Sequence, residues 1–236
     1  MQPKICHDWD LAIPEARALQ EQLRGRVIER DTGRAPRLVA GADISFDRSS
    51  PELHAAVVVL DAESLEVVEI AAVRARARFP YVPGYLSFRE IPPLLEAFAK
   101  LEAAPDLIVC DGQGRAHPRR FGLACHLGVL LDRPTLGCAK SRLVGDYREP
   151  GPRRGAHTRL RDAGEVIGEV VRTRSGVKPV FVSVGHRISL ETARRTALRL
   201  APRYRLPEPV RAAHREVNRL RRLATSGGCT GPRSVV

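Results

Sequence analysis

The order of short apolar runs along the chain constrains the fold most, because it fixes the number and spacing of buried strands. Runs at 38–46, 55–60 and 65–79 follow one another with only short turns between them. Further runs at 106–110 and 135–139 alternate with segments of helical periodicity. Consecutive strands followed by alternating strands and helices are typical of a mixed sheet. The sequence therefore predicts an α/β fold, in which a central mixed β-sheet is flanked by helices on both faces.

The spacing of these runs also predicts where the helices and the domain end. We expect helices at 10–28, 92–101, 121–131, 189–200 and 209–223. Strands at 166–174 and 180–184 are expected to pair as a hairpin closed at Ser175–Gly176. No repeat or linker interrupts the pattern, so we expect a single domain over residues 1–224. Residues 225–236, rich in glycine and serine, are expected to form a disordered tail.

Several features bear on the compartment. No apolar run approaches the ~20 residues that a membrane span needs. The first residues lack the basic and then apolar pattern of a signal peptide. The five cysteines show no C-x-x-C spacing, which fits reduced thiols. We therefore expect a cytoplasmic protein without membrane association, and the sequence indicates no obligate protein partner.

The net charge of +12 favours a polyanionic partner. Phosphate backbones are the commonest partners of such an excess, because binding releases counterions. Only four of the 39 basic residues are lysines, so a bias toward arginine codons in a high-GC genome is an alternative source of the charge. Charge alone therefore favours a nucleic-acid ligand, and codon bias remains an alternative explanation of the arginine content.

Two aspartates lie in or directly after apolar strands. Asp43 lies in the otherwise apolar segment 39–46, where an unpaired carboxylate is disfavoured by desolvation. It is expected to be protonated, paired or metal-bound, unless it simply faces solvent. Asp111 directly follows the apolar run 107–110 and opens a glycine-rich, basic loop. Ligand sites gather at the carboxyl ends of strands in open α/β sheets, although such an aspartate can also merely cap the next helix.

Glu90 has two interpretations. Ser87 and Glu90 match a capping box, in which the glutamate only braces a helix start. Pro92 and Pro93 would then fall in the second helical turn, where proline is disfavoured. We therefore expect the helix to begin near the prolines and Glu90 to be free in the entry turn. Three carboxylates from separate segments would suit a divalent-metal phosphodiesterase.

Four motif segments resemble the endonuclease V family, in its order and spacing. They are Gly41–Phe46, Pro80–Glu90, Asp111–Pro118 and Gly185–Ser189, and the likeness runs from about Trp9 to Leu220. The resemblance implies an RNase H-like fold and a Mg²⁺-dependent endonuclease, for which Mn²⁺ can substitute. It implies hydrolysis of the second phosphodiester bond 3′ of deoxyinosine (deaminated adenine) in double- or single-stranded DNA, leaving 3′-hydroxyl and 5′-phosphate ends.

The resemblance also implies functional roles for individual residues. It assigns the metal site to Asp43, Glu90 and Asp111, and adds Lys140 and His214 as catalytic residues. Lys140 and His214 could instead be ordinary surface residues. The wedge that enters the base stack is assigned to Pro80, Tyr81, Val82 and Pro83, and the base pocket to main chain near Gly84, Leu86, Gly112 and Gly137. Phosphate contacts are predicted for Arg89, His117 and His186.

Two alternatives to this function remain. A nuclease of the same fold could act on inosine in RNA, since nothing in the sequence identifies the sugar. A non-catalytic protein could bind lesions or DNA structures through the basic surface alone. The retained set of Asp43, Glu90 and Asp111 argues against simple binding, because acid facing phosphate weakens it.

Overall fold

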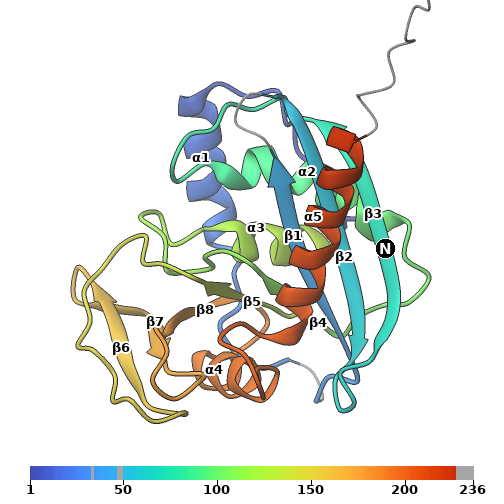
Figure 1. Cartoon of the computed structure of the whole chain (residues 1–236). Helices are drawn as coiled ribbons and strands as arrows, with labels where there is room; N and C mark the ends of the chain where they lie inside the picture. The colour runs from blue at the N-terminus through green and yellow to red at the C-terminus, as the bar shows by residue number, and fades with distance from the viewer. Residues whose placement is uncertain (33–34, 47–49, 227–236) are drawn as a thin grey trace, which may run out of the picture.

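One eight-stranded mixed sheet runs through the computed structural model, which describes residues 1–32, 35–46 and 50–226 (Figure 1). Its strand order is β3-β2-β1-β4-β5-β8-β7-β6. The strands are β1 (Leu38–Phe46), β2 (Glu52–Asp61), β3 (Val67–Arg76), β4 (Leu107–Cys110), β5 (Thr135–Ala139), β6 (His157–Asp162), β7 (Glu165–Val171) and β8 (Val180–His186). The helices are α1 (Ile13–Arg24), α2 (Leu86–Ala99), α3 (Leu123–Leu131), α4 (Leu190–Arg199) and α5 (Glu208–Ser226).

The pairing pattern brings three strand ends to one edge of the sheet. β1, β4 and β5 are parallel neighbours, while the remaining pairs are antiparallel. In the parallel register Ala42 lies opposite Cys110, and Cys110 lies opposite Gly137. Residues that follow these positions therefore emerge side by side, at the carboxyl edge where α/β proteins commonly place ligand sites.

Helices cover both faces of the sheet, as the sequence predicts. Alternate residues of a strand point to opposite faces, so each strand feeds two cores. α2 and α3 bury Ile91, Phe98 and Leu127 against one face, and α1 packs outside α3. α4 and α5 bury Ala197 and Val210 against the other face. The mixed sheet with two helical layers is the RNase H-like arrangement expected from the motifs.

α5 rests directly on the main chain of β1. A Cβ atom placed on Gly41 would lie only 1.9 Å from the carbonyl oxygen of Pro209, so any side chain would push the helix away. Glycine at this position lets the helix approach at backbone distance. The contact lies two residues before Asp43 and five residues before His214.

Two expectations about the elements are wrong. α2 begins at Leu86 after Tyr85, not near the prolines, and Pro92 and Pro93 lie inside it. The helix tolerates them because apolar packing of its buried face outweighs the two missing N–H groups. The tight turn also lies elsewhere: β7 does pair with β8, but the two-residue turn is Ala163–Gly164, between β6 and β7, and both residues have positive φ.

Most other boundaries agree with the expectation. β1 and β5 have the expected limits, and α5 extends to Ser226. The expected tail lies mostly at 227–236, outside the described residues. Among residues 1–32, 35–46 and 50–226, no helix has the length and apolarity that a membrane crossing requires.

Candidate active site

Asp43 and His214 meet between β1 and α5. The Nδ1 atom of His214 lies 2.8 Å from Oδ2 of Asp43. The aspartate side chain is 10% exposed and the histidine 49% exposed, so the imidazole covers the carboxylate from the solvent side. Burial, and then the negative charge of Asp111, raise the pKa of Asp43 to about 6, against the opposing effects of His214 and Lys140.

Asp111 and Lys140 meet at the ends of β4 and β5. The Nζ atom of Lys140 lies 2.5 Å from Oδ2 of Asp111. The lysine side chain is 41% exposed, so its ammonium stays accessible to a ligand. The main chain at this lysine is braced, because Arg205 donates hydrogen bonds to the carbonyls of Lys140 and Pro179.

Glu90 reaches the same place from α2. Burial is the main cause that raises its pKa to about 8, and the charges of Asp43 and Asp111 raise it further, while Arg89 opposes them. Three carboxyl groups from three elements therefore crowd one another at this edge. Mutual repulsion of this kind is typical of a site that receives positive charge from a ligand.

The donor atoms suit a divalent cation. One ligand atom each of Asp43, Asp111 and His214 lie within 4.8 Å of one another. Glu90 lines the same cavity of about 230 Å³ but does not belong to this close group. Carboxylate oxygens are the ligands that Mg²⁺ and Mn²⁺ prefer, and a bound cation would oppose the burial and mutual repulsion that raise the pKa of Asp43 and Glu90. The residues therefore fit such an ion.

A larger cavity of about 380 Å³ adjoins the acidic cavity. Both cavities are lined by Glu90, Asp111, Leu123 and Lys140. Tyr81, Pro83, Gly84, Leu86 and Gly112, all predicted for the wedge or the base pocket, also line the larger one. Its size is sufficient for a flat heterocycle, and its position puts such a group next to the carboxylates.

The loop at 80–85 stands over the larger cavity. Tyr81 is 53% exposed, and its ring lies 5.8 Å from that of Phe46, measured between centroids. Arg89 donates a hydrogen bond to the carbonyl of Phe79, and its guanidinium lies 5.2 Å from the Phe46 ring. Arg89, predicted to contact phosphate, therefore braces the base of this loop.

Of three other predicted residues, His117 lines the larger cavity and Gly137 and His186 do not. Gly137 lies in β5 behind the cavity wall, where a Cβ would lie 2.5 Å from the nitrogen of Gly114. His117 lines the larger cavity, but one ring nitrogen donates to the carbonyl of Gly84 and the other accepts from the N–H of Arg119. His186 pairs with Thr135 at the start of β5, so the structure does not bring it to this edge.

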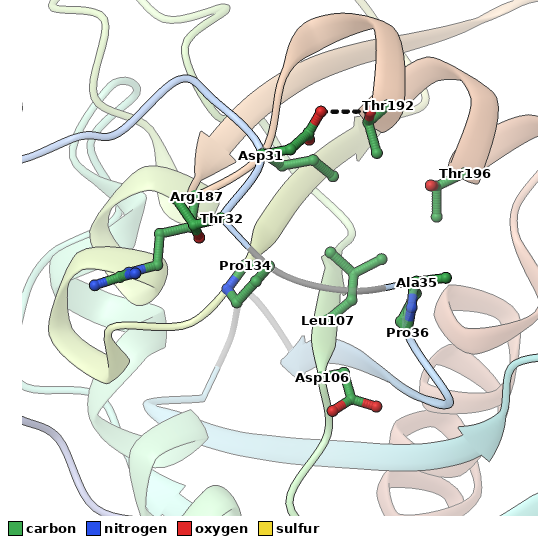
Figure 2. Close-up of a pocket in the computed structure, with 11 residues that line it drawn as sticks. Asp31, Thr32, Ala35, Pro36, Asp106, Leu107, Pro134, Arg187, Thr192 and Thr196 are labelled. Atoms are coloured by element: carbon green, nitrogen blue, oxygen red, sulfur yellow. Dashed lines mark hydrogen bonds between the residues drawn. The ribbon is translucent and has the colours of Figure 1, made fainter.

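A further cavity, of about 240 Å³, lies at the opposite end of the strands (Figure 2). Its acidic groups hold the fold together. Asp31 accepts hydrogen bonds from Ser189 and Thr192 at the start of α4, and Asp106 accepts two from main-chain N–H groups at 37 and 38. These contacts make it a structural junction rather than a reactive centre.

The sequence interpretation missed two polar residues of the larger cavity. The sequence predicts Ser87 only as a helix cap, yet its hydroxyl contacts His126 of α3. Gln113 lines the cavity, donates to the carbonyl of Ser141, and has a buried Oε1 without a hydrogen-bond partner. Only the position of Gln113 in the glycine-rich loop after Asp111 could have indicated it.

An acidic cluster at the ends of adjacent parallel strands, in an RNase H-like fold, defines the class of this protein as a nuclease. The sequence profile of endonuclease V matches residues 21–215. An endonuclease V of Roseiflexus sp. (strain RS-1) is 55% identical over 213 residues, which cover 90% of this chain and 95% of that protein. The chain belongs to the endonuclease V family.

Solved structures agree with this assignment. The crystal structure of endonuclease V from Streptomyces avermitilis superposes with a TM-score of 0.88 at 48% identity, covering 95% of this chain and all of that one. Endonuclease V of Ciona intestinalis, solved in complex with a DNA 24mer containing an inosine followed by a ribo-adenosine, gives a TM-score of 0.80 at 28% identity. That match covers 90% of this chain and 98% of the other.

Proposed function

We propose that this nuclease is a DNA repair enzyme that recognises deoxyinosine and hydrolyses the second phosphodiester bond on its 3′ side. The observation that carries the proposal is the junction of the two cavities, because Glu90, Asp111 and Lys140 line both. A base held in the larger cavity leaves its own strand beside the acidic cluster. The inosine-containing DNA bound by the Ciona relative supports the choice of base.

Asp43 and Asp111 would hold Mg²⁺ or Mn²⁺, with Glu90 at the edge of the same cavity. When bound, the ion supplies Lewis-acid stabilisation of the negative charge on the phosphate. The Nδ1–H of His214 would donate to the Oδ2 atom of Asp43, 2.8 Å away, and so orient that carboxylate. These residues define where the scissile phosphate lies.

Lys140 acts on the phosphate itself. Its ammonium is a compact donor, held by Asp111 and exposed toward the cavities. Such a group stabilises negative charge that develops on a phosphate oxygen. Because Lys140 belongs to both cavities, it couples the position of the bound base to the position of the cleaved bond.

Tyr81 and its loop would unstack the bases of a DNA duplex. Prolines on both sides of the segment stiffen the main chain, so the exposed ring enters the base stack at small entropic cost. The target nucleotide then rotates into the larger cavity, as in other enzymes that act on bases. Main chain near Gly84 and Gly112 would contact the base, because both glycines line this cavity.

Cleavage of labelled oligonucleotides tests the proposal. Matched DNA strands and duplexes, with or without one deoxyinosine, and the corresponding inosine RNA are incubated with Mg²⁺ or with EDTA. The proposal expects one nick, mapped to the second bond 3′ of deoxyinosine and dependent on Mg²⁺. Asp43→Ala and Asp111→Ala should bind the inosine duplex but lower cleavage by ~10³-fold or more.

Three other results would contradict the proposal. Preferential cleavage of RNA would identify a ribonuclease acting on inosine. Binding without cleavage by the parent protein would identify a binding protein. Undiminished nicking by either alanine variant would reject the metal site.

A further inference from the structure

A row of hydrogen bonds runs from the larger cavity to the N-terminal segment. Ser87, which lines the cavity, has its Oγ 3.1 Å from Nδ1 of His126. Nε2 of His126 lies 2.8 Å from Nε2 of His7. Nδ1 of His7 lies 2.6 Å from the carbonyl oxygen of Asp8. Residues far apart in the sequence thus form one chain of contacts.

The carbonyl of Asp8 fixes the direction of the whole row. A carbonyl can only accept, so Nδ1 of His7 must donate. Both imidazoles are neutral, since burial lowers the pKa of His126 well below its usual value and that of His7 as well. His7 Nε2 is therefore an acceptor, and His126 donates to it from Nε2. The bare Nδ1 of His126 then accepts the hydroxyl proton of Ser87.

A free serine hydroxyl can donate or accept a hydrogen bond. The hydroxyl of Ser87 already donates its proton to Nδ1 of His126. Only its lone pairs remain for a ligand in the cavity. Gln113 has the same character for an independent reason, because its amide nitrogen donates to the carbonyl of Ser141. That contact assigns the oxygen Oε1 to the other side, where it is buried and has no partner. Both buried side chains are thus acceptors.

We propose that His7 and His126 are positioning residues for the base cavity, which hold Ser87 as a hydrogen-bond acceptor and favour a base that presents a ring N–H. This inference rests on the proposed function, because it concerns the choice of base by that site. Hypoxanthine presents N1–H on its Watson–Crick edge. Adenine has a bare N1, which would face a lone pair and be repelled. The arrangement separates the deaminated base from the ordinary one.

The test measures base preference rather than activity alone. Single-turnover cleavage with Mg²⁺ is compared on two strands that differ at one nucleotide, deoxyinosine or deoxynebularine, whose unsubstituted purine has a bare N1. His7→Phe lets His126 move its proton to Nδ1 and donate to Ser87, which frees the serine proton for the cavity. His126→Phe frees the same proton directly.

Both variants should lower the inosine-to-nebularine rate ratio by roughly three- to tenfold, which is the effect expected for the loss of one hydrogen bond. Trp9→Phe is the matched control, because the Trp9 ring stacks on His126 with centroids 5.5 Å apart and lies outside the row. It should leave the ratio unchanged. Thermal unfolding of each variant checks the fold. If His126→Phe fails to fold, His7→Phe still tests the inference, because His7 is only half-buried.

An unchanged ratio in the folded histidine variants, or an equal loss on both strands, would overturn the inference while the parent still cleaves inosine DNA. An equal shift in Trp9→Phe would also overturn it, since packing would then be the cause. Failure of the parent to cleave inosine DNA would instead overturn the proposed function, and this inference with it.

Discussion

Lys140 lines both cavities, and its ammonium lies 2.5 Å from Oδ2 of Asp111. Arginine keeps the charge but spreads it over a wide planar group, which does not fit the same position between Asp111 and a phosphate. We expect Lys140→Arg to lower single-turnover cleavage of inosine DNA by ~10²-fold, nearly as much as Lys140→Ala, with a small loss of affinity.

Lys178→Arg provides the matched control, because Lys178 is exposed and lies outside both cavities. Cleavage by Lys140→Arg at the parent rate would show that the residue supplies only diffuse charge.

Glu90 links the site to pH through its raised pKa. The folded protein holds this proton up to about pH 8, whereas an unfolded chain releases it near 4.5. Between these values the folded state binds more protons, so stability falls as the pH rises. Asp43, with its pKa raised to about 6, contributes in the same direction. We expect the urea midpoint in EDTA to decrease from pH 5 to pH 8.

Glu90→Gln should flatten this decrease, and Glu96→Gln should not, since Glu96 is an exposed residue of the same helix. Equal slopes for the parent and Glu90→Gln would contradict the assignment of the raised pKa to Glu90.

Three of the residues that line the acidic cavity share one property. Asp43 lies within the largely apolar β1, whereas Asp111 and Lys140 directly follow β4 and β5, and parallel strands carry such positions to one edge. The roles of Ser87 and His126 could not be predicted in this way. They depend on a contact between segments 39 residues apart, and on His7, which is 119 residues from His126. Side-chain periodicity carries no information about such contacts.

At the scale of elements, the loop at 80–85 and the start of α2 work together. Arg89 on α2 holds the carbonyl of Phe79, while Tyr81 remains exposed. We expect Tyr81→Ala to weaken binding and nicking more on duplex DNA than on a single strand. A wedge acts only where a neighbouring base must be unstacked, which requires a few kcal/mol.

Tyr204→Ala is the control, since Tyr204 is also exposed but packs under Arg211. Equal losses on duplex and single-stranded substrates would show that Tyr81 only supports the loop.

Elements with a clear apolar pattern were predicted well, and those without one were not. β1 and β5 are largely apolar and have the predicted limits. β6 was missed because its sequence, His-Thr-Arg-Leu-Arg-Asp, is largely charged, as is common for an edge strand. The predicted start of α2 is wrong because tertiary packing of its apolar face outweighs the local steric effect of the two prolines.

At the scale of the whole molecule, the net charge of +12 acts on any nucleic acid, whereas the cavity acts only on the altered base. Counterion release makes the binding that comes from net charge strongly dependent on salt concentration. We expect affinity for undamaged duplex to fall by ~10³- to 10⁵-fold between 50 and 200 mM salt, if about 6–10 phosphates are contacted.

The ratio of affinities for inosine and matched undamaged duplex should change by less than about threefold over the same range, because hydrogen bonds in a buried cavity are weakly screened. Fluorescence anisotropy at several salt concentrations measures both quantities. A preference for inosine that disappears with salt would mean that charge, and not the cavity, provides the discrimination.

The contact between Gly41 and Pro209 determines how the site responds to heat. Main-chain atoms have no rotamers to exchange, so warming that loosens side chains leaves the spacing of β1 and α5 unchanged at this point. Asp43 and His214 take their separation from that spacing. Turnover should therefore rise smoothly with temperature and then stop within a narrow interval, when α5 leaves the sheet as a unit. We therefore expect activity to be lost on heating at the temperature at which α5 separates from β1.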